Sequence, residues 1–289
     1  MRLSLGLPVF NGGAYLDSCL RSITAQTCAD FELIICDNAS TDETEAIARA
    51  WCARDRRIAY HRAPENRGAA RNFNWAFELA TGELFKWCAV DDLLEPSFLA
   101  RCVQALDAHP DAVLAYTGTL DIDERGTVVR EIYDNSTALA FDAPDVAARF
   151  RDLVVVDHSC ISVFGVIRSA ALRDTALIAP YPGSDRALLV ELGLRARFVR
   201  IVDNLMLHRE HVERSTKKYP RMLDRVLWFS GRRARLSFPH FRLLGVYTYD
   251  MLRTPMSMRQ RLRCLEALVR WIYWGAWRRL LKDITDHFR

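Results

Sequence analysis

The sequence lacks any apolar stretch long enough to cross a bilayer, although half of its 289 residues are hydrophobic. Its longest run without a charged residue covers 14 positions, residues 3–16, and is interrupted by Pro8, Gly12 and Gly13. A membrane-spanning helix needs about 20 apolar residues. The N-terminus also lacks the pattern of a signal peptide. We therefore expect no transmembrane helix.

Lysine is scarce, with four residues in the chain, and none of them follows a glycine-rich loop in the order Gly-Lys-Ser/Thr. This excludes a P-loop and argues against a Schiff-base lysine. Closely spaced cysteines are also absent, because the eight cysteines are at least eight positions apart and lie mostly in apolar stretches. A chain of this size needs no disulfide, so we expect reduced core thiols in a cytosolic protein.

Charge is distributed unevenly along the chain. The net charge is +4, but residues 1–216 hold 23 Lys and Arg against 31 Asp and Glu, whereas residues 217–289 hold 17 against 5. The last quarter is therefore a basic region attached to an acidic body. We expect the body, residues 1–216, and the basic helical C-terminal region, residues 217–289, to form separate units.

Strand-like apolar runs alternate with helical patterns in the first 110 residues. The predicted strands are 3–10, 31–37, 58–62 and 84–90, and the predicted helices are about 16–25, 40–54, 68–80 and 96–108. This alternation predicts an α/β fold with a parallel sheet covered by helices on both faces. Such sheets bind ligands beyond the carboxyl ends of their strands, where Asn11, Asp37, Asn66, Asp91 and Asp92 lie here.

The pattern is mixed after residue 117. It predicts a hairpin around residues 123–126, a short helix near 144–150, an apolar run at 161–167, a helix at about 185–194 and a strand near 198–202. Beyond residue 217 the pattern is helical, with interruptions at Pro239 and Pro255.

Two adjacent acidic residues, Asp91 and Asp92, close a hydrophobic strand. Two buried carboxylates without compensation would cost roughly several kcal/mol each, so a positive group should lie opposite them. A divalent cation with oxygen ligands, bridging to a phosphate-bearing substrate, would meet this need. An Asp-rich turn that caps the following helix is the alternative.

Five separated motifs together resemble the nucleotide-binding half of the family 2 glycosyltransferases. They are residues 5–11, 26–27, 31–44, 66–72, and Gly82 with the Asp91-Asp92 pair. The resemblance is dense over about residues 1–120 and thinner to about 216. It implies an A-type glycosyltransferase fold, with a Rossmann-like, mostly parallel sheet flanked by helices, and a nucleotide-diphosphate sugar across the strand ends. The body then divides into a nucleotide-binding half, 1–120, and an acceptor and catalytic-base half, 121–216.

The resemblance also implies which residues meet the nucleotide. They are Pro8, Val9, Phe10, Asn11, Asp37, Asn66, Arg71 and Asp91. Asp37 matches the carboxylate that contacts the base, which suits the N–H donor of uracil or thymine, and Asp91 matches the residue near the ribose. Core packing is the alternative for Phe10, and a surface salt bridge is the alternative for Arg71.

Asp92 matches the family's metal ligand, and His211 matches a second ligand of Mn²⁺ or Mg²⁺ or a contact to the diphosphate. His208 is the competing histidine, and a solvent-exposed loop histidine is the alternative. Many relatives carry Asp-x-Asp-Asp where this chain has Ala89-Val90-Asp91-Asp92, so the first acid is absent. This departure puts the strength of metal binding in doubt.

Asp185 follows a Pro/Gly loop and opens a predicted helix. It resembles the family's catalytic base, which deprotonates the acceptor hydroxyl. One base and a metal-stabilised leaving group imply a single displacement with inversion. Capping of the helix by Ser184 or Asp185 is the alternative.

Apolar residues recur at helical spacing near the C-terminus. They are Met258, Leu262, Leu265, Val269, Ile272, Ala276 and Leu280, surrounded by seven Arg and Lys with Trp and Tyr between them. This composition is typical of an interfacial helix on an anionic membrane. A helix packed on the catalytic domain or in a homodimer interface is the alternative. We expect no nucleic-acid partner, because no recognition motif accompanies the charge.

The sequence thus predicts an inverting glycosyltransferase that uses a UDP- or dTDP-sugar, Mn²⁺ or Mg²⁺, and a glycan or glycolipid acceptor at the cytoplasmic membrane face of a bacterium. Two alternatives stay open. One is a nucleotidyltransferase on a related sheet, which would need a basic loop after the first strand. The other is a non-catalytic nucleotide-sugar or membrane-binding homologue, for which the missing acid at Ala89 is the only hint.

Overall fold

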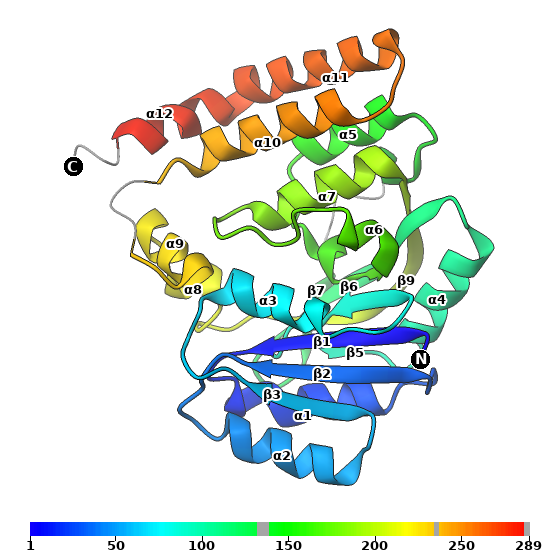
Figure 1. Ribbon diagram of the computed structural model, residues 1–289, viewed down its shortest axis with the longest axis vertical. Coiled ribbons are helices and arrows are strands. Elements are labelled where there is room, and N and C mark those ends of the chain that lie inside the picture. Colours follow the sequence, from blue (N-terminus) through cyan, green and yellow to red (C-terminus); the bar gives the residue numbers. More distant parts are fainter. Residues whose placement is uncertain (132–138, 234–236, 286–289) are drawn as a thin grey trace.

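The computed structural model describes residues 1–131, 139–233 and 237–285. Within them nine strands form one sheet, in the order β3-β2-β1-β4-β8-β6-β9-β5, with β7 paired to β6 (Figure 1). The strands are β1 (Leu3–Val9), β2 (Phe31–Asp37), β3 (Ile58–Arg62), β4 (Leu84–Trp87), β5 (Leu93–Leu94), β6 (Ala112–Ile122), β7 (Val128–Glu131), β8 (Val166–Arg168) and β9 (Arg197–Arg209). Strands β1 to β4 are parallel, as are β6 and β9.

The predicted α/β fold with a mostly parallel sheet is confirmed. All seven residues of β1 are buried, as expected for a central parallel strand with helices on both faces. The predicted fourth strand ends earlier than expected, at Trp87, because the chain turns there toward the acidic pair. The predicted hairpin forms between β6 and β7.

Helices cover both faces of the sheet, with α1 and α2 on the side opposite α3 (Figure 1). The helices of the first half are α1 (Gly13–Thr24), α2 (Thr44–Arg54), α3 (Ala69–Glu78) and α4 (Phe98–Ala108). Those of the second half are α5 (Val146–Val155), α6 (Ser169–Arg173), α7 (Ser184–Arg195) and α8 (Ser215–Lys218). The apolar run at 161–167 divides into a 3₁₀ turn, Ile161–Phe164, and strand β8.

The C-terminal helices pack against the second half of the body. They are α9 (Met222–Ser230), α10 (Pro239–Arg253), α11 (Met258–Trp271) and α12 (Trp277–Thr285). Helix α10 lies against α7, and α11 lies against α5. The side chains of Cys264, Leu268 and Trp271 are buried in the same apolar cluster as α5 and α7. One face of α11 is therefore part of the core. This agrees with the alternative given for this region, a helix packed on the catalytic domain.

The predicted apolar stripe does not face the core along its whole length. Met258, Leu262, Leu265 and Val269 are exposed, whereas Ala276 is buried. The stripe turns from exposed to buried at a break in the helix, where residues 272–276 form a π turn and Gly275 leaves helical geometry. No helix in the described part of the chain is long and apolar enough to span a membrane. The eight cysteines all lie in described parts of the chain, and none of them forms a disulfide there.

A backbone contact joins the C-terminal region to the first half. Gly231, which ends α9, and Gly68, which precedes α3, have φ angles of 67° and 84°. A Cβ atom added to Gly231 would lie 2.7 Å from the backbone carbon of Arg67. Only glycine tolerates both the left-handed conformation and this approach. The contact therefore fixes α9 against α3.

We expect Gly231→Ala to lower the free energy of unfolding by about 1–3 kcal/mol, because alanine is strained in the left-handed region and its methyl group would meet the backbone of Arg67. The control is Gly245→Ala in α10, where an added Cβ meets no atom of the described residues within 4 Å. That change should raise the free energy of unfolding by about 0.5–1 kcal/mol. Urea denaturation of both variants measures the difference, and equal effects would contradict this account of the contact.

Candidate active site

The carboxyl edge of the parallel strands carries the candidate site. Strands β1 and β2 end together at this edge, and Asp91 and Asp92 follow β4 there. The chain then enters β5, which pairs with β9. Strand β9 therefore brings His208 to the acidic pair, and His211 follows two residues after that strand ends.

Each carboxylate of the pair meets a different histidine. Asp92 Oδ1 lies 2.9 Å from His208 Nδ1 and accepts a hydrogen bond of 3.0 Å from the backbone N–H of Arg209. Asp91 Oδ2 lies 2.9 Å from His211 Nε2. The sequence predicts that Asp92 and His211 bind the same metal ion, with His208 as the alternative to His211. The structure places His208 on Asp92 and His211 on Asp91.

The pKa values of the two carboxylates are shifted in opposite directions. Burial raises the pKa of Asp92, and the hydrogen bond with His208 offsets this only in part. Burial also lowers the pKa of His208, but the hydrogen bond and charge of Asp92 outweigh it, so that this pKa is raised. Both directions favour a proton held between the two groups. At Asp91 the hydrogen bond with His211 outweighs burial, and the pKa falls below its ordinary value.

Arg209 holds the surrounding segments together. Its Nε donates to the carbonyl oxygen of Asp91 at 2.9 Å, and its Nη1 donates to the carbonyl oxygens of Asp123 and Glu124, each at 2.9 Å. The guanidinium carbon lies 5.1 Å from the ring centre of Tyr15. Arg209 thereby ties the end of β9 to the acidic turn, the β6–β7 hairpin and α1.

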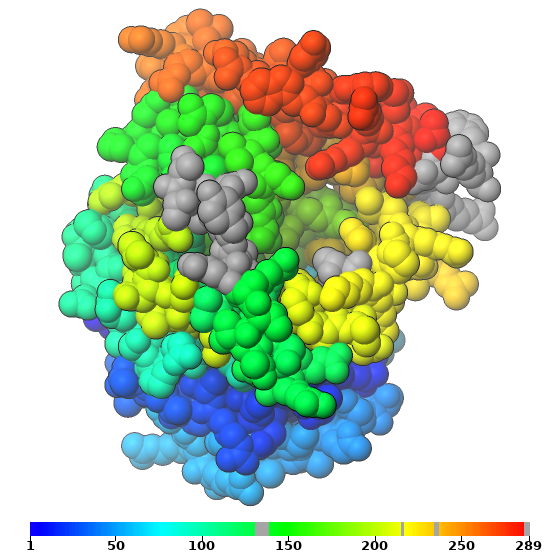
Figure 2. Space-filling view, turned by 180° about the vertical axis from the view of Figure 1, so that it is seen from behind, coloured from blue at the N-terminus to red at the C-terminus, as the bar shows by residue number. Residues whose placement is uncertain are grey.

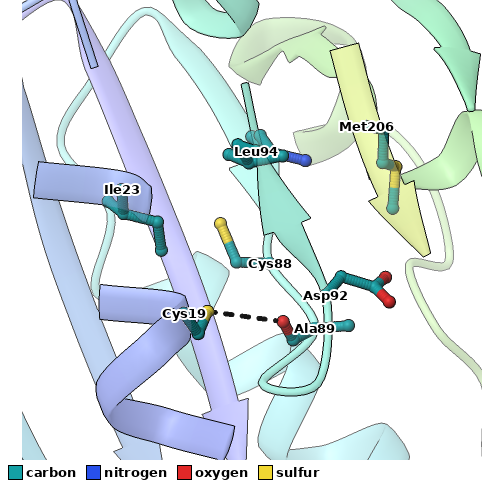
Figure 3. Close-up of a pocket in the computed structure, with 8 residues that line it drawn as sticks. Cys19, Ile23, Cys88, Ala89, Asp92, Leu94 and Met206 are labelled. Atoms are coloured by element: carbon teal, nitrogen blue, oxygen red, sulfur yellow. Dashed lines mark hydrogen bonds between the residues drawn. The ribbon is translucent and has the colours of Figure 1, made fainter. Parts of the chain in front are cut away.

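A buried lysine lies beneath the acidic pair. Lys86, on β4, is 1% exposed, and its Nζ donates to the carbonyl oxygen of Phe164. Lys86 and Asp92 share a cavity of about 10 Å³ whose walls include Cys19 and Cys88 (Figure 3), which is room for about one water molecule. Burial lowers the pKa of Lys86, and the nearby Asp92 opposes this. Basic groups therefore do surround the pair, as its burial required.

Asp37 is fully buried at the end of β2. Its Oδ1 accepts from the backbone N–H of Ser40 at 2.8 Å, and its Oδ2 accepts from the hydroxyl of Tyr60 at 2.6 Å and from Arg62 at 3.1 Å. Contact between Asp37 and a nucleotide base stays a prediction. A base that bonds to this carboxylate would have to share it with these three donors.

The loop after β1 presents an exposed aromatic ring. Pro8 and Val9 are buried in β1, whereas Phe10 is 43% exposed, so core packing is not its role. Asn11 has a φ angle of 50°, and its Oδ1 accepts from the backbone N–H of Thr41 at 2.8 Å. The loops after β1 and β2 are thus tied together at the edge of the sheet.

Asn66 and Arg71 lie at the start of α3. Asn66 Oδ1 accepts from Asn38 Nδ2 at 2.8 Å and from the backbone N–H of Gly68 at 2.9 Å, which fixes the turn into the helix. Arg71 is exposed, and its guanidinium lies 3.7 Å from the carboxylate of Glu78. The structure therefore shows Arg71 in a surface ion pair, which the sequence analysis gave as the alternative to nucleotide binding. Its contact to a nucleotide stays a prediction.

Asp185 lies in the first turn of α7. The residue before the helix is Gly183, with a φ angle of 89°, and no described side chain caps the helix. The alternative role for this segment, capping by Ser184 or Asp185, is therefore wrong. Asp185 Oδ1 accepts from the backbone N–H of Arg186 at 2.9 Å. Burial raises the pKa of Asp185, a direction that suits a group that must accept a proton.

Several side chains at this edge could hold a metal ion. Asp92 Oδ2 and His211 Nδ1, atoms of the two predicted ligands, are buried and have no hydrogen-bond partner among the residues that the structure describes. In addition, ligand atoms of Asp121, His208 and Glu210 lie within 4.8 Å of one another. No sequence motif marks Asp121 as a metal ligand, because a lone aspartate within an apolar strand is recognised as one only once its pairing with β9 is known.

The chain matches the family model described as Glycosyl transferase family 2 over residues 4–170, which is more than half of its length. The protein belongs to this family. The matched region runs from β1 through β8 and contains the acidic pair. The family assignment made from the sequence motifs is thereby confirmed.

Curated relatives align with less than half of the chain. A PGL/p-HBAD biosynthesis glycosyltransferase of Mycobacterium bovis is 37% identical over 115 residues, which is 39% of this chain and 44% of that protein. Chondroitin synthase of Escherichia coli is 29% identical over 132 residues, or 46% of this chain and 19% of that protein. The alignments therefore span less than half the length of either relative.

Solved structures share the fold over nearly the whole chain. S. aureus TarS 1–349 in complex with UDP-GlcNAc aligns with a TM-score of 0.69 at 16% identity, covering 95% of this chain and 73% of that chain. A mannosyltransferase of Pyrobaculum calidifontis in complex with GDP-Man and Mn²⁺ aligns with a TM-score of 0.55 at 18% identity, covering 100% and 81%. The likeness supports the A-type glycosyltransferase fold predicted from the sequence.

Proposed function

We propose that this chain is an inverting, metal-dependent glycosyltransferase that moves a sugar from a UDP- or dTDP-sugar to a hydroxyl acceptor in the synthesis of a bacterial surface polysaccharide or glycolipid. The observation that carries the proposal is the Asp91-Asp92 pair at the carboxyl edge of the sheet, held by His208 near the end of β9 and by His211 just after it. Family membership supports the reaction class. The names of the mycobacterial and Escherichia coli relatives support the acceptor class.

Comparison with solved structures supports a nucleotide-sugar donor. TarS was solved with UDP and with UDP-GlcNAc, which favours a uridine donor, whereas the archaeal mannosyltransferase was solved with GDP-Man. In this chain the exposed ring of Phe10 and the carboxylate of Asp37 lie at the ends of neighbouring strands. A ring for stacking and a carboxylate that accepts from a base N–H suit a pyrimidine.

A divalent ion, Mn²⁺ or Mg²⁺, fits the acidic edge. Asp92 Oδ2 and His211 Nδ1 are buried and have no hydrogen-bond partner within the described residues, and a carboxylate with an imidazole is a suitable donor set. When bound, the ion would supply positive charge to the diphosphate leaving group. The Mn²⁺ in the archaeal mannosyltransferase structure is in accord with this choice of metal.

Asp185 is the group that removes the proton from the acceptor. Its carboxylate takes the hydroxyl proton as the hydroxyl oxygen bonds to the anomeric carbon and the bond from that carbon to the diphosphate oxygen breaks. Because attack and departure occur on opposite faces in one displacement, the configuration inverts. The raised pKa of Asp185 makes the carboxylate a stronger base than an exposed aspartate.

The first prediction concerns the donor base. UDP or dTDP should stabilise the full chain more than GDP or ADP when Mn²⁺ is present, because Asp37 suits a pyrimidine. At about 100 times its Kd a ligand stabilises by roughly 2.7 kcal/mol. A thermal-shift panel of the four nucleotides, with metal and with chelator, measures this. Equal shifts for all four nucleotides would contradict the pyrimidine assignment.

The second prediction concerns the base. Asp185→Asn should keep the affinity for UDP but lower kcat for transfer by about 10²-fold or more, the lower end of what general-base catalysis contributes. In the wild type, kcat should fall as the pH falls through the pKa of Asp185, which lies above 3.8. The measurements are kcat for transfer and Kd for UDP in both proteins. Glu191→Gln, on the same helix, is the control and should retain transfer; near-normal transfer by Asp185→Asn would reject Asp185 as the base.

The exposed stripe of the C-terminal helices supports peripheral binding to an anionic membrane. In the space-filling view the orange and red C-terminal part forms one end of the molecule, opposite the blue N-terminal part (Figure 2). The stripe consists of Met258, Leu262, Leu265, Val269, Tyr273, Trp274, Trp277 and Leu281, all exposed. Arg259, Arg270, Arg278, Arg279 and Lys282 are exposed on the same helices. Apolar and aromatic side chains among arginines match the interface of an anionic bilayer.

The third prediction tests this surface without disturbing the core. The wild type should sediment with vesicles that contain phosphatidylglycerol, and Leu262→Glu/Val269→Glu should weaken this binding at least tenfold, because each buried Leu or Val contributes about 1.5–3 kcal/mol. Val202→Glu is the control, since Val202 is 82% exposed on β9. Two results would reject membrane binding by this surface. One is a wild-type protein that stays in the supernatant, and the other is a double variant that still binds vesicles but dissociates a dimer.

A further inference from the structure

A second group of metal-ligating side chains lies beside the acidic pair. Asp121 is near the end of β6, and the parallel register of β6 and β9 sets it directly opposite His208. Glu210 follows β9. Ligand atoms of the three residues lie within 4.8 Å of one another, a separation that a single ion with bonds of about 2.0–2.4 Å can bridge after small side-chain adjustments.

Asp121 is the strongest reason to expect a ligand at this position. Its side chain is completely buried. Arg130 Nε donates to Oδ2 at 2.5 Å, but Oδ1 has no hydrogen-bond partner within the described residues. A buried carboxylate oxygen without a partner costs free energy. A cation on Oδ1 would remove this cost without disturbing the ion pair on Oδ2.

His208 has the orientation that metal-binding histidines usually have. Its Nδ1 lies 2.9 Å from Asp92 Oδ1, so the tautomer that donates from Nδ1 leaves the Nε2 lone pair for a ligand. In metal sites the second ring nitrogen typically donates to a carboxylate, which fixes the tautomer and the ring orientation. Asp92 performs this function for His208.

Glu210 contributes the third oxygen ligand. Its carboxylate is paired with Arg214 and with Lys217, whose Nζ lies 2.8 Å away. These cations compete with a metal ion for the same oxygens. A bound divalent ion would therefore displace at least one of them.

We propose that Asp121, His208 and Glu210 form a divalent-cation site whose ligands differ from the Asp92 and His211 ligands of the proposed donor metal, and that Asp92 orients His208 within it. Two carboxylates and one imidazole suit Mn²⁺ or Zn²⁺ better than Ca²⁺, which prefers oxygen ligands only. The site does not depend on the proposed sugar transfer, because its ligands all belong to the protein.

The test is a titration of the chelator-treated full chain with Mn²⁺ alone, without nucleotide, in which free Mn²⁺ is measured by electron paramagnetic resonance, followed by competition with Zn²⁺. The wild type should bind Mn²⁺, and Glu210→Gln should weaken this binding at least tenfold. The matched control is Glu213→Gln, which makes the same change at an exposed glutamate three residues later and should bind as the wild type does. Circular dichroism confirms that each variant is folded.

His211→Ala separates this site from the donor metal. In this variant the Mn²⁺ that still binds without nucleotide should be lost on the further change Glu210→Gln, whereas Asp92→Asn should weaken that binding about 10–100-fold, the usual effect of losing a carboxylate that orients a histidine ligand. Three results would overturn the proposal: no binding of either metal to the wild type, equal binding by Glu210→Gln and Glu213→Gln, or loss of binding in His211→Ala with retention in Glu210→Gln. None of these results depends on whether the chain transfers a sugar.

Discussion

The site depends on two adjacent carboxylates at the end of a central strand. The side chain of Asp92 is buried and that of Asp91 is 25% exposed. Each lies 2.9 Å from a histidine nitrogen, and Lys86 lines a small cavity with Asp92. Carboxylates buried without such partners would destabilise the fold by roughly several kcal/mol each. The histidines are provided by β9 and the residues after it, so the second half of the body is required for the acidic turn of the first half.

This dependence explains the path of the chain around the site. Strand β9 pairs with β6 along most of its length and with β5 at its end, and the position of these pairings decides which side chains meet the acidic turn. Arg209 then joins the turn, the β6–β7 hairpin and α1. The C-terminal helices pack on α5 and α7, so the helix that carries Asp185 is held between the sheet and α10.

Much of the first half could be predicted from the sequence, because its strands are short apolar runs bounded by turn residues and its motifs are specific. The pairing of the histidines could not, since it depends on the register of β5 and β9, which local pattern does not determine. Asp121 carries no motif. The buried face of α11 could not be predicted either. Cys264 and Trp271, which are buried, lie beside the predicted apolar stripe. The sequence pattern alone does not determine which of two neighbouring apolar faces meets α5.

The anomeric configuration of the product tests the central claim most directly. The full chain is incubated with a UDP- or dTDP-sugar, a hydroxyl-bearing glycan or glycolipid acceptor and Mn²⁺, and the anomeric proton of the transferred sugar is followed by ¹H NMR. A single displacement with Asp185 as the base predicts a product of opposite configuration to the donor, formed by the wild type and not by Asp185→Asn. A product that retains the donor configuration would contradict the account.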